Sequence, residues 1–150
     1  MSQLLKRVLF VCVGNACRSQ MAEAFARVYG QDALVAASAG LTPAMAVMPD
    51  TVRAMAEKEI DMRDQFPKSI RHLRRSQFDL VVNMTGRPLP DDIGAPIEEW
   101  SVPDPVLMDY EKHCEVRDQI ERLVMNLILK LRREQQAPRF RGQGSGRLKV

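Results

Sequence analysis

A cysteine and an arginine that could carry out chemistry stand close together near the start of the chain. Cys12 ends the apolar run Val8–Val11, and Arg18 follows six residues later, directly before Ser19 and a segment with helical spacing. A loop between a strand and a helix points its backbone N–H groups into the space in front of the helix, where the helix dipole adds about half a positive charge. Such a loop binds a tetrahedral oxyanion. The sequence therefore predicts an oxyanion site with a thiol at its floor.

The residue types inside this loop fit the same chemistry. Gly14 lets the backbone turn tightly, and Asn15 tolerates the left-handed conformation. Arg18 can bind two oxygens of the anion with its planar guanidinium. Donors and a fixed cation around Cys12 favour its thiolate, the nucleophilic form, and Ser19 could donate a hydrogen bond to that sulfur. The alternative is that Cys12 is a small buried apolar residue, the usual place of a strand cysteine.

The elements that must position this loop alternate along the chain. Apolar runs predict buried strands over residues 7–13, 33–38 and 78–84, with a weaker fourth strand over residues 95–100. Helical spacing predicts helices over residues 19–30, 49–60 and 116–131, and a short basic helix over residues 68–75. This alternation favours an α/β fold with a parallel sheet and helices on both faces. Ligands bind such sheets beyond the carboxyl ends of the strands, which is where Cys12 lies.

Length and composition limit the class of protein. With 150 residues, of which 45% are hydrophobic and 27% charged, the chain is long enough for one domain with a single core. No apolar run reaches the roughly 18 residues of a membrane span, and the first run is interpreted as a strand of a cytoplasmic protein, not as a signal peptide. Three cysteines are too few for a disulfide framework, and the spacing of cysteines and histidines forms no zinc motif, so no metal is expected.

The net charge of +3 comes from the last residues of the chain. Residues 135–150 carry four basic residues and no acidic one, which leaves 18 basic against 19 acidic residues in the rest. We therefore divide the chain into an α/β domain, residues 1–134, and a basic tail, residues 135–150. The tail is expected to be flexible and solvated, and an arm for nucleic acid or for a membrane is the alternative, so neither is an expected partner.

Three segments resemble those of one enzyme family. The loop "VCVGNACRS" (Val11–Ser19) matches the C-x5-R-S loop of the low-molecular-weight protein tyrosine phosphatases and of the arsenate reductases that share their fold. "SAG" (Ser38–Gly40) is similar to the family's second-strand segment, and "VPDP" (Val102–Pro105) to its aspartate–proline loop. The resemblance covers about residues 6–133. It implies a four-stranded parallel sheet flanked by helices, and no metal or organic cofactor.

The resemblance also assigns roles to the matching residues. Cys12 would attack the phosphorus of a phosphomonoester and form a phosphocysteine. Asp104 would protonate the leaving oxygen and then act as a base on the hydrolytic water. Arg18 and the rest of the loop would bind the oxyanion, and the side chains of Asn15 and Ser19 would support the site. The other loop residues are Val13, Gly14, Asn15, Ala16, Cys17 and Ser19.

Departures from the family pattern keep two activities open. Aliphatic residues occupy positions 106–107, where the eukaryotic phosphatases place aromatic ones. At position 20 this chain has glutamine, as the reductases do, whereas the phosphatases usually have proline. The thioredoxin-coupled reductases carry two further cysteines after the third strand, whereas this chain reads "NMTGRPLPDDIGAP", so such a relay cannot run. Cys17 either pairs with Cys12 in a protective disulfide or merely faces that loop. Cys114 is expected to be a bystander on the last helix.

The first expectation is therefore a cysteine-dependent phosphomonoester hydrolase that acts on a phosphorylated protein or a small aryl phosphate. The alternative is an arsenate reductase with an external thiol as reductant, supplied by glutaredoxin and glutathione or by mycothiol. Arsenate is a near-isostere of phosphate, so the same loop would bind either oxyanion. A third interpretation is a phosphate-binding module without catalysis.

Overall fold

A four-stranded parallel sheet forms the centre of the molecule, as the sequence predicts. The computed structural model describes the backbone of residues 5–73 and 77–148, and side chains as far as residue 136. The strands lie in the order β2-β1-β3-β4, and each neighbouring pair is parallel. Their bounds are β1 Lys6–Cys12, β2 Leu34–Gly40, β3 Leu80–Asn83 and β4 Ile97–Glu99.

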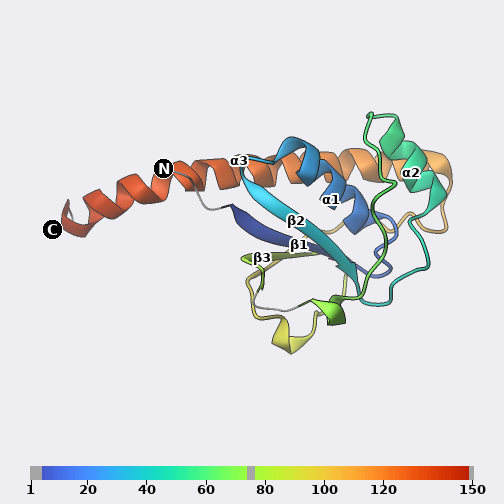
Figure 1. Ribbon diagram of the computed structural model, residues 1–150, viewed down its shortest axis with the longest axis horizontal. Helices are drawn as coiled ribbons and strands as arrows, with labels where there is room; N and C mark the ends of the chain where they lie inside the picture. Colours follow the sequence, from blue (N-terminus) through green and yellow to red (C-terminus); the bar gives the residue numbers. More distant parts are fainter. Residues whose placement is uncertain (1–4, 74–76, 149–150) are drawn as a thin grey trace.

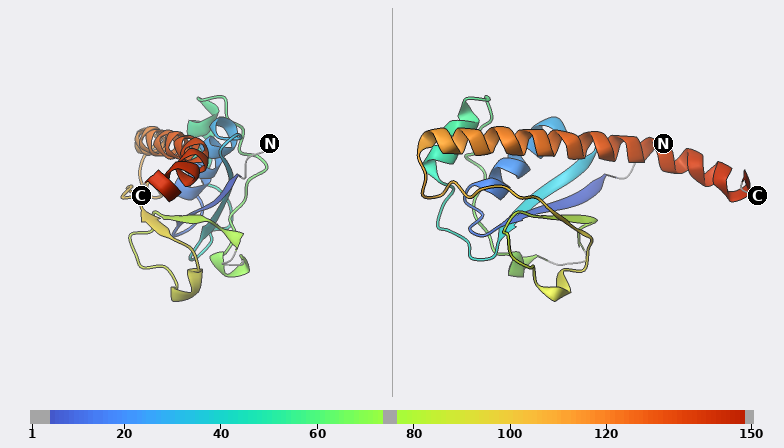
Figure 2. Two further views of the ribbon diagram at one scale, coloured as in Figure 1. Left: turned by 90° about the vertical axis from the view of Figure 1, so that its left-hand side faces the viewer. Right: turned by 180° about the vertical axis from the view of Figure 1, so that it is seen from behind.

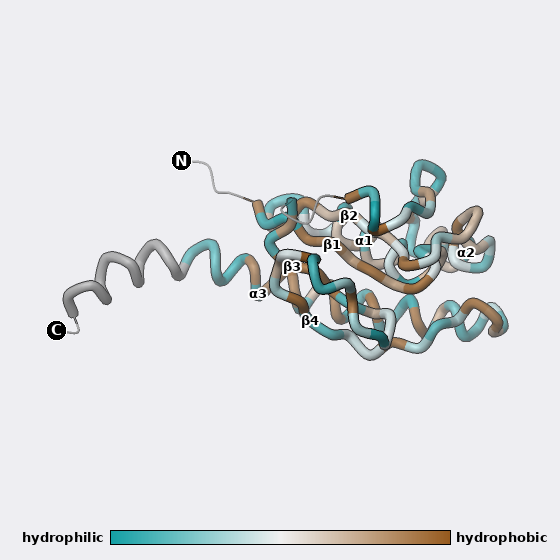
Figure 3. Tube along the Cα trace, turned by 90° about the horizontal axis from the view of Figure 1, so that it is seen from below, coloured by the Kyte–Doolittle hydropathy of each residue, from teal (hydrophilic) through white to brown (hydrophobic). Residues whose placement is uncertain are grey.

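Strand β1 lies in the middle of the sheet because its side chains are apolar on both faces. Val8 and Phe10 are fully buried in the cluster on one face, and Leu9 and Val11 in the cluster on the other. Figure 3 shows this strand as an apolar segment at the centre of the molecule. Cys12, the last residue of the strand, falls on the same face as Val8 and Phe10.

Three α-helices pack against that first face. They are α1 Arg18–Tyr29, α2 Pro49–Ala56 and α3 Tyr110–Leu148. Helix α1 buries Ala22, Phe25 and Ala26 against the sheet and α3, and it ends at Gly30, whose N–H donates to the carbonyl of Ala26. Both the buried face and the glycine stop confirm the prediction for this segment. Figures 1 and 2 show α1 and α3 lying along the same side of the sheet.

The opposite face of the sheet is covered by short 3₁₀ helices and by the segments that connect them. These are η1 Ile70–His72 and η3 Asp91–Ile93, drawn in light green and yellow below the sheet in Figure 1. The cluster that they cover is small, so a short cover is enough: Leu9, Val11, Ala39, Ile70, Val81 and Leu89. Helices therefore lie on both faces, but those on this face are single 3₁₀ turns. Within the expected basic helix over residues 68–75, the described residues 68–73 contain η1, and residues 74–76 lie outside the described part.

Helix α3 docks through the apolar stripe that its sequence predicts. Val116, Ile120, Val124 and Ile128 are almost completely buried in the main cluster. The backbone continues as helix to Leu148, so residue 134 is not a break in the helix, and the division into a domain and a separate flexible tail stays a prediction. Among the described helices, none combines the length and the apolar character that crossing a bilayer requires.

The topology places a crevice at the carboxyl end of β1. The chain goes from β1 to β2 on one side and then returns to β3 on the other side of β1. In open α/β sheets, ligands bind where the strand order reverses in this way. The end of β1, the loop 13–17 and the end of β3 meet at this point, together with the segment after β4 that contains Asp104.

Candidate active site

The loop after β1 curls over the Cys12 sulfur and presents unpaired backbone donors. Residues 13–17 connect β1 to the first turn of α1. Among the described hydrogen bonds, none has a backbone N–H of this loop as its donor, although Asn15, Ala16 and Cys17 are buried. Buried N–H groups normally have an acceptor, so a set of unpaired ones around a thiol is what an anion site requires. The loop therefore has the donors of an oxyanion cradle, and that it binds an oxyanion stays a prediction.

The tight turn depends on Asn15 and not on Gly14. Asn15 has a φ of 51°, in the left-handed region, as the sequence predicts. Gly14 is not among the residues of positive φ, and a Cβ built on it would meet nothing closer than 3.9 Å. The expectation that Gly14 supplies the conformational freedom is therefore wrong.

A different glycine allows the loop to form. A Cβ on Gly40, the last residue of β2, would lie 2.9 Å from the Asn15 nitrogen and 2.9 Å from the Val13 carbonyl oxygen. Real Cβ atoms essentially never approach backbone so closely. Glycine in the segment "SAG" therefore lets β2 pack against the cradle, a role that the sequence pattern alone did not indicate.

The Cys12 sulfur is held by Ser19. Cys12 Sγ lies 2.9 Å from Ser19 Oγ, and the backbone N–H of Ser19 donates to Sγ at 3.4 Å. Cys12 is 2% exposed, and Ser19 is fully buried. The sequence-based expectation that Ser19 can donate to the sulfur fits this geometry, and the neighbouring hydrogen bonds decide which atom is the donor.

The Asn15 side chain fixes the direction of this hydrogen bond. Asn15 Oδ1 accepts from the backbone N–H of Lys68 at 2.9 Å and from Gln20 Nε2 at 3.0 Å. A backbone N–H can only donate, so the amide orientation is determined. Asn15 Nδ2 then donates to Ser19 Oγ at 2.7 Å and to Ser38 Oγ at 3.0 Å. The Ser19 hydroxyl therefore receives a hydrogen bond and keeps its own hydrogen for the Cys12 sulfur.

A buried carboxylate anchors the far end of this chain of hydrogen bonds. Ser38 Oγ donates to Glu23 Oε1 at 2.6 Å. Glu23 is 2% exposed and forms an ion pair with Arg27, one turn further along α1. An ionised carboxylate only accepts, so Ser38 must donate to Glu23 and accept from Asn15. Glu23 and the side chain of Ser38 were not predicted from the sequence. The available signal was their polar character inside buried segments.

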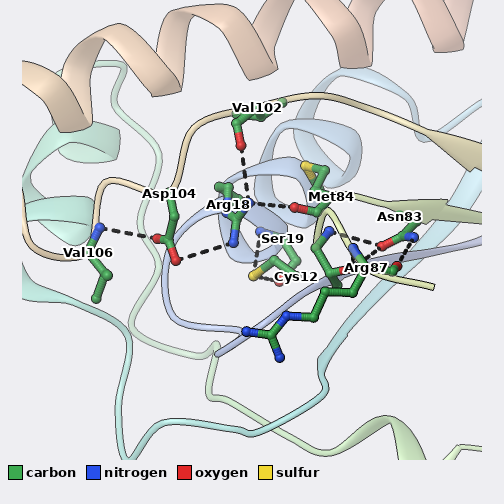
Figure 4. Close-up of polar contacts among 10 residues, drawn as sticks. Cys12, Arg18, Ser19, Asn83, Met84, Arg87, Val102, Asp104 and Val106 are labelled. Carbon is green, nitrogen blue, oxygen red and sulfur yellow. Dashed lines mark hydrogen bonds and ion pairs between the residues drawn. The ribbon is translucent and has the colours of Figure 1, made fainter. Parts of the chain in front are cut away.

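Arg18 is held by two backbone carbonyl oxygens and by Asp104. Its Nη1 donates to the carbonyl oxygens of Met84, after β3, and of Val102, at 3.1 Å in the second case. Its Nη2 lies 3.3 Å from Asp104 Oδ2. The buried Nε has no hydrogen-bond partner among the described residues. Figure 4 shows Arg18 between these groups, with Cys12 at its side. An oxyanion above the Cys12 sulfur would supply the acceptor that Nε requires.

Asp104 lies at the mouth of the site. Its Oδ1 accepts from the backbone N–H of Val106 at 3.1 Å, which closes a tight turn, and prolines stand on both sides. Its side chain is 41% exposed and contacts Arg18, so it lies between solvent and the loop after β1. The structure thus brings together the three residues predicted to be catalytic: Cys12, Arg18 and Asp104.

The second cysteine of the loop is a buried neutral thiol. Burial raises the pKa of Cys17 to about 12, and the Asp104 and Cys12 charges add to this, while Thr51 and Arg18 act in the opposite direction. Thr51 in turn contacts Nδ1 of the fully buried His113 at 3.0 Å. Cys17 is therefore protonated at neutral pH. Cys12 and Cys17 are both free thiols.

The described residues contain no group of three or more His, Cys, Asp or Glu that could hold a metal ion. Cys114 lies on α3, half-buried, with Arg117 Nη1 3.8 Å from its sulfur. Among the described residues, its contacts belong to the region where α2 meets α3 and not to the loop after β1.

Comparisons with known proteins agree with the fold. The family described as low molecular weight phosphotyrosine protein phosphatase matches residues 7–91. The glutaredoxin arsenate reductase of Synechocystis sp. (strain ATCC 27184 / PCC 6803 / Kazusa) is 34% identical over 131 residues, which are 85% of this chain and 99% of that protein.

Two solved structures give the same result. An arsenate reductase in its phosphate-binding state has a TM-score of 0.79 at 34% identity, covering 85% of this chain and 99% of that one. A low molecular weight protein tyrosine phosphatase from T. tengcongensis has a TM-score of 0.70 at 28% identity, covering 84% and 99%. The chain belongs to the low molecular weight phosphotyrosine protein phosphatase family. Within that family it is an enzyme with cysteine-based chemistry.

Proposed function

We propose that this protein reduces arsenate to arsenite at Cys12 and takes its electrons from an external thiol. The observation that carries the proposal is the set of unpaired donors around the Cys12 sulfur: the loop N–H groups and the buried Nε of Arg18. These donors fit a tetrahedral oxyanion of the size of phosphate or arsenate. The names of similar proteins favour arsenate over phosphate esters as the substrate. The sequence alone favoured phosphomonoester hydrolysis, whereas the similar proteins named above include arsenate reductases.

The reaction balances with two thiols per arsenate. The Cys12 thiolate attacks arsenic, and a hydroxyl of arsenate leaves as water with a proton from Asp104. The external thiolate then attacks the Cys12 sulfur, so an S–S bond forms. The electron pair of the S–As bond passes to arsenic, which leaves as arsenite in the trivalent state. A second external thiol reduces the mixed disulfide and returns Cys12 to its thiolate, with release of the oxidised thiol.

An external thiol is needed because the chain offers no suitable internal one. Cys17 keeps its proton, because burial raises its pKa to about 12, and a protonated thiol is a poor nucleophile. Cys114 contacts Arg117 on α3, in the α2–α3 contact. Besides these two, Cys12 is the only cysteine of the full sequence. Free thiols also suit a reducing compartment, and we place the protein in the cytoplasm.

Phosphomonoester hydrolysis is the second candidate, and the position of Asp104 favours it. A carboxyl group 3.3 Å from Arg18, at the mouth of the cradle, can protonate the leaving oxygen of an ester. Cys12 would then carry the phosphoryl group as a phosphocysteine. Beyond Asp104 the chain offers Val106 and a 95% exposed Leu107, so the described rim provides no aromatic side chain at this place to stack on an aryl group.

The two activities are separated by parallel assays on one preparation. Arsenite formation is measured with glutathione and glutaredoxin, and with mycothiol, beside hydrolysis of p-nitrophenyl phosphate. We expect thiol-dependent arsenite formation that inorganic phosphate inhibits. Cys12→Ser should abolish turnover but still bind phosphate, and Cys114→Ser is the matched control that should keep full activity. If ester hydrolysis proceeds and no thiol supports arsenite formation, the second candidate replaces the first.

A further inference from the structure

An arginine that the proposed chemistry does not use stands beside the cradle. Arg87 lies in the turn after β3, three residues beyond Met84, whose carbonyl oxygen holds Arg18. Figure 4 shows its side chain extending from this turn below Cys12, with the guanidinium in front of the loop that follows β1 in this view. The residue is exposed, in contrast to Arg18, which is 5% exposed.

The backbone that carries Arg87 is rigid. Its N–H donates to Thr85 Oγ1 at 2.9 Å, and its carbonyl oxygen accepts from Asn83 Nδ2 at 2.8 Å. Asn83 Oδ1 in turn accepts from the backbone N–H of Thr85 at 2.9 Å. Gly86, with a φ of 75°, completes the turn, and Pro88 restricts Arg87 from the other side. A fixed turn of this kind reduces the entropy lost when the side chain binds a partner.

The guanidinium of Arg87 is free to bind an anion. No carboxylate of the described residues forms an ion pair with it, whereas Arg18 faces Asp104. Arg18 is 5% exposed and has Asp104 as its carboxylate partner, so Arg87 is the more accessible of the two arginines. A cation at the mouth, outside the cradle, reaches the part of a molecule that projects away from the Cys12 sulfur. Arginine binds carboxylates through two parallel hydrogen bonds.

We propose that Arg87 recognises the carboxylate of the thiol that resolves the Cys12 adduct. The inference rests on the proposed function, since only a reductase of this kind needs a second thiol at Cys12. It selects a carboxylate-bearing thiol such as glutathione over mycothiol, whose sugar-based structure carries no carboxylate. Arg87 binds the carboxylate, the attacking sulfur is thereby brought in line with Cys12, and the residue takes no part in the bond changes.

The test uses disulfide probes and does not depend on arsenate. The Cys12 thiolate attacks 5,5′-dithiobis(2-nitrobenzoate), forms a mixed disulfide and releases one coloured thiolate that bears a carboxylate. The neutral disulfide 2,2′-dithiodipyridine reacts in the same way without a carboxylate. Both rates are measured in a Cys114→Ser background, so that Cys12 is the accessible thiol, for Arg87→Ala, Arg87→Lys and the control Arg122→Ala, an exposed arginine on α3.

We expect Arg87→Ala to slow the anionic probe about fivefold, the effect of one exposed charge pair, with the neutral probe unchanged. Arg87→Lys should retain part of the preference, and Arg122→Ala all of it. Equal rate changes for both probes, or none, would overturn the inference. Arsenite formation then separates the two proposals. If Arg87→Ala raises the KM for glutathione and leaves the rate with neutral 2-mercaptoethanol unchanged, both the reductase activity and the carboxylate recognition are supported. A probe preference that depends on Arg87, without arsenite formation by any thiol, supports the recognition and rejects the reductase.

Discussion

Alanine at position 40 would press a methyl group against the backbone of the oxyanion cradle. Its Cβ would lie 2.9 Å from the Asn15 nitrogen, the Asn15 Cβ and the Val13 carbonyl oxygen. Two of these atoms are backbone, which has no rotamer that relieves the contact. Either β2 moves away from the loop, or the loop loses the conformation in which Asn15 has a φ of 51°.

The cost follows from the kind of contact. Overpacking of this type destabilises a protein by about 1–3 kcal/mol. For a chain of this size, each kcal/mol lowers the Tm by about 2–4 °C, so Gly40→Ala should lower it by about 2–12 °C. Because the displaced group is Asn15, whose side chain sets the donor direction of Ser19, affinity for phosphate should fall by about tenfold, equivalent to roughly 1.4 kcal/mol.

Thermal unfolding and competitive inhibition by phosphate measure the two effects. Gly14→Ala is the matched control, because its Cβ has no neighbour within 3.9 Å and alanine reduces the entropy of the unfolded chain. Its Tm should be unchanged or slightly raised. A Gly40→Ala variant with the Tm and the phosphate affinity of the parent would show that β2 does not hold the loop in place.

Two further predictions concern the other polar groups of the site. Cys17 should resist iodoacetamide at pH 8 while Cys12 reacts, because burial raises the Cys17 pKa to about 12 and keeps that thiol protonated. Peptide mass spectrometry identifies the modified residue. Early labelling of Cys17 would contradict its burial. If the enzyme hydrolyses esters, Asp104→Asn should slow the hydrolysis of alkyl phosphates by about a hundredfold and that of p-nitrophenyl phosphate far less, because only a poor leaving group needs the proton. Steady-state kinetics measures both rates. Equal slowing of both substrates would show that Asp104 is not the acid.

Local patterns predicted the first strand and the position of Cys12 at its end. Cys12 at the end of an apolar run, Arg18 six residues later and a following helix define the cradle, because each of these features is set within a short segment. The apolar stripe of α3 is equally local. Asp104 could be predicted only through the resemblance, since a turn aspartate has no distinguishing pattern of its own.

Features that depend on contacts between distant segments were missed. Gly40 is required because β2 packs against the loop after β1, and Glu23 has its role because Ser38 of β2 donates a hydrogen bond to it. Spacing along the chain contains neither fact. The short cover on the second face was also not foreseen, because η1 and η3 are single turns whose apolar residues are too few to give a period. Polar residues inside otherwise buried segments, such as Glu23 and Ser38, indicate hydrogen bonds between distant segments.

The covalent state of Cys12 during turnover, read from the mass of its peptide, tests most directly the claim that an external thiol resolves the Cys12 adduct. The protein is incubated with arsenate and glutathione, quenched with an alkylating agent and digested, and the peptide that contains Cys12 is identified by mass spectrometry. We predict a mixed disulfide between Cys12 and glutathione that forms only when arsenate is present and is lost in Cys12→Ser. A Cys12–Cys17 disulfide in its place, or a Cys12 that stays a free thiol while arsenite accumulates, would contradict the account.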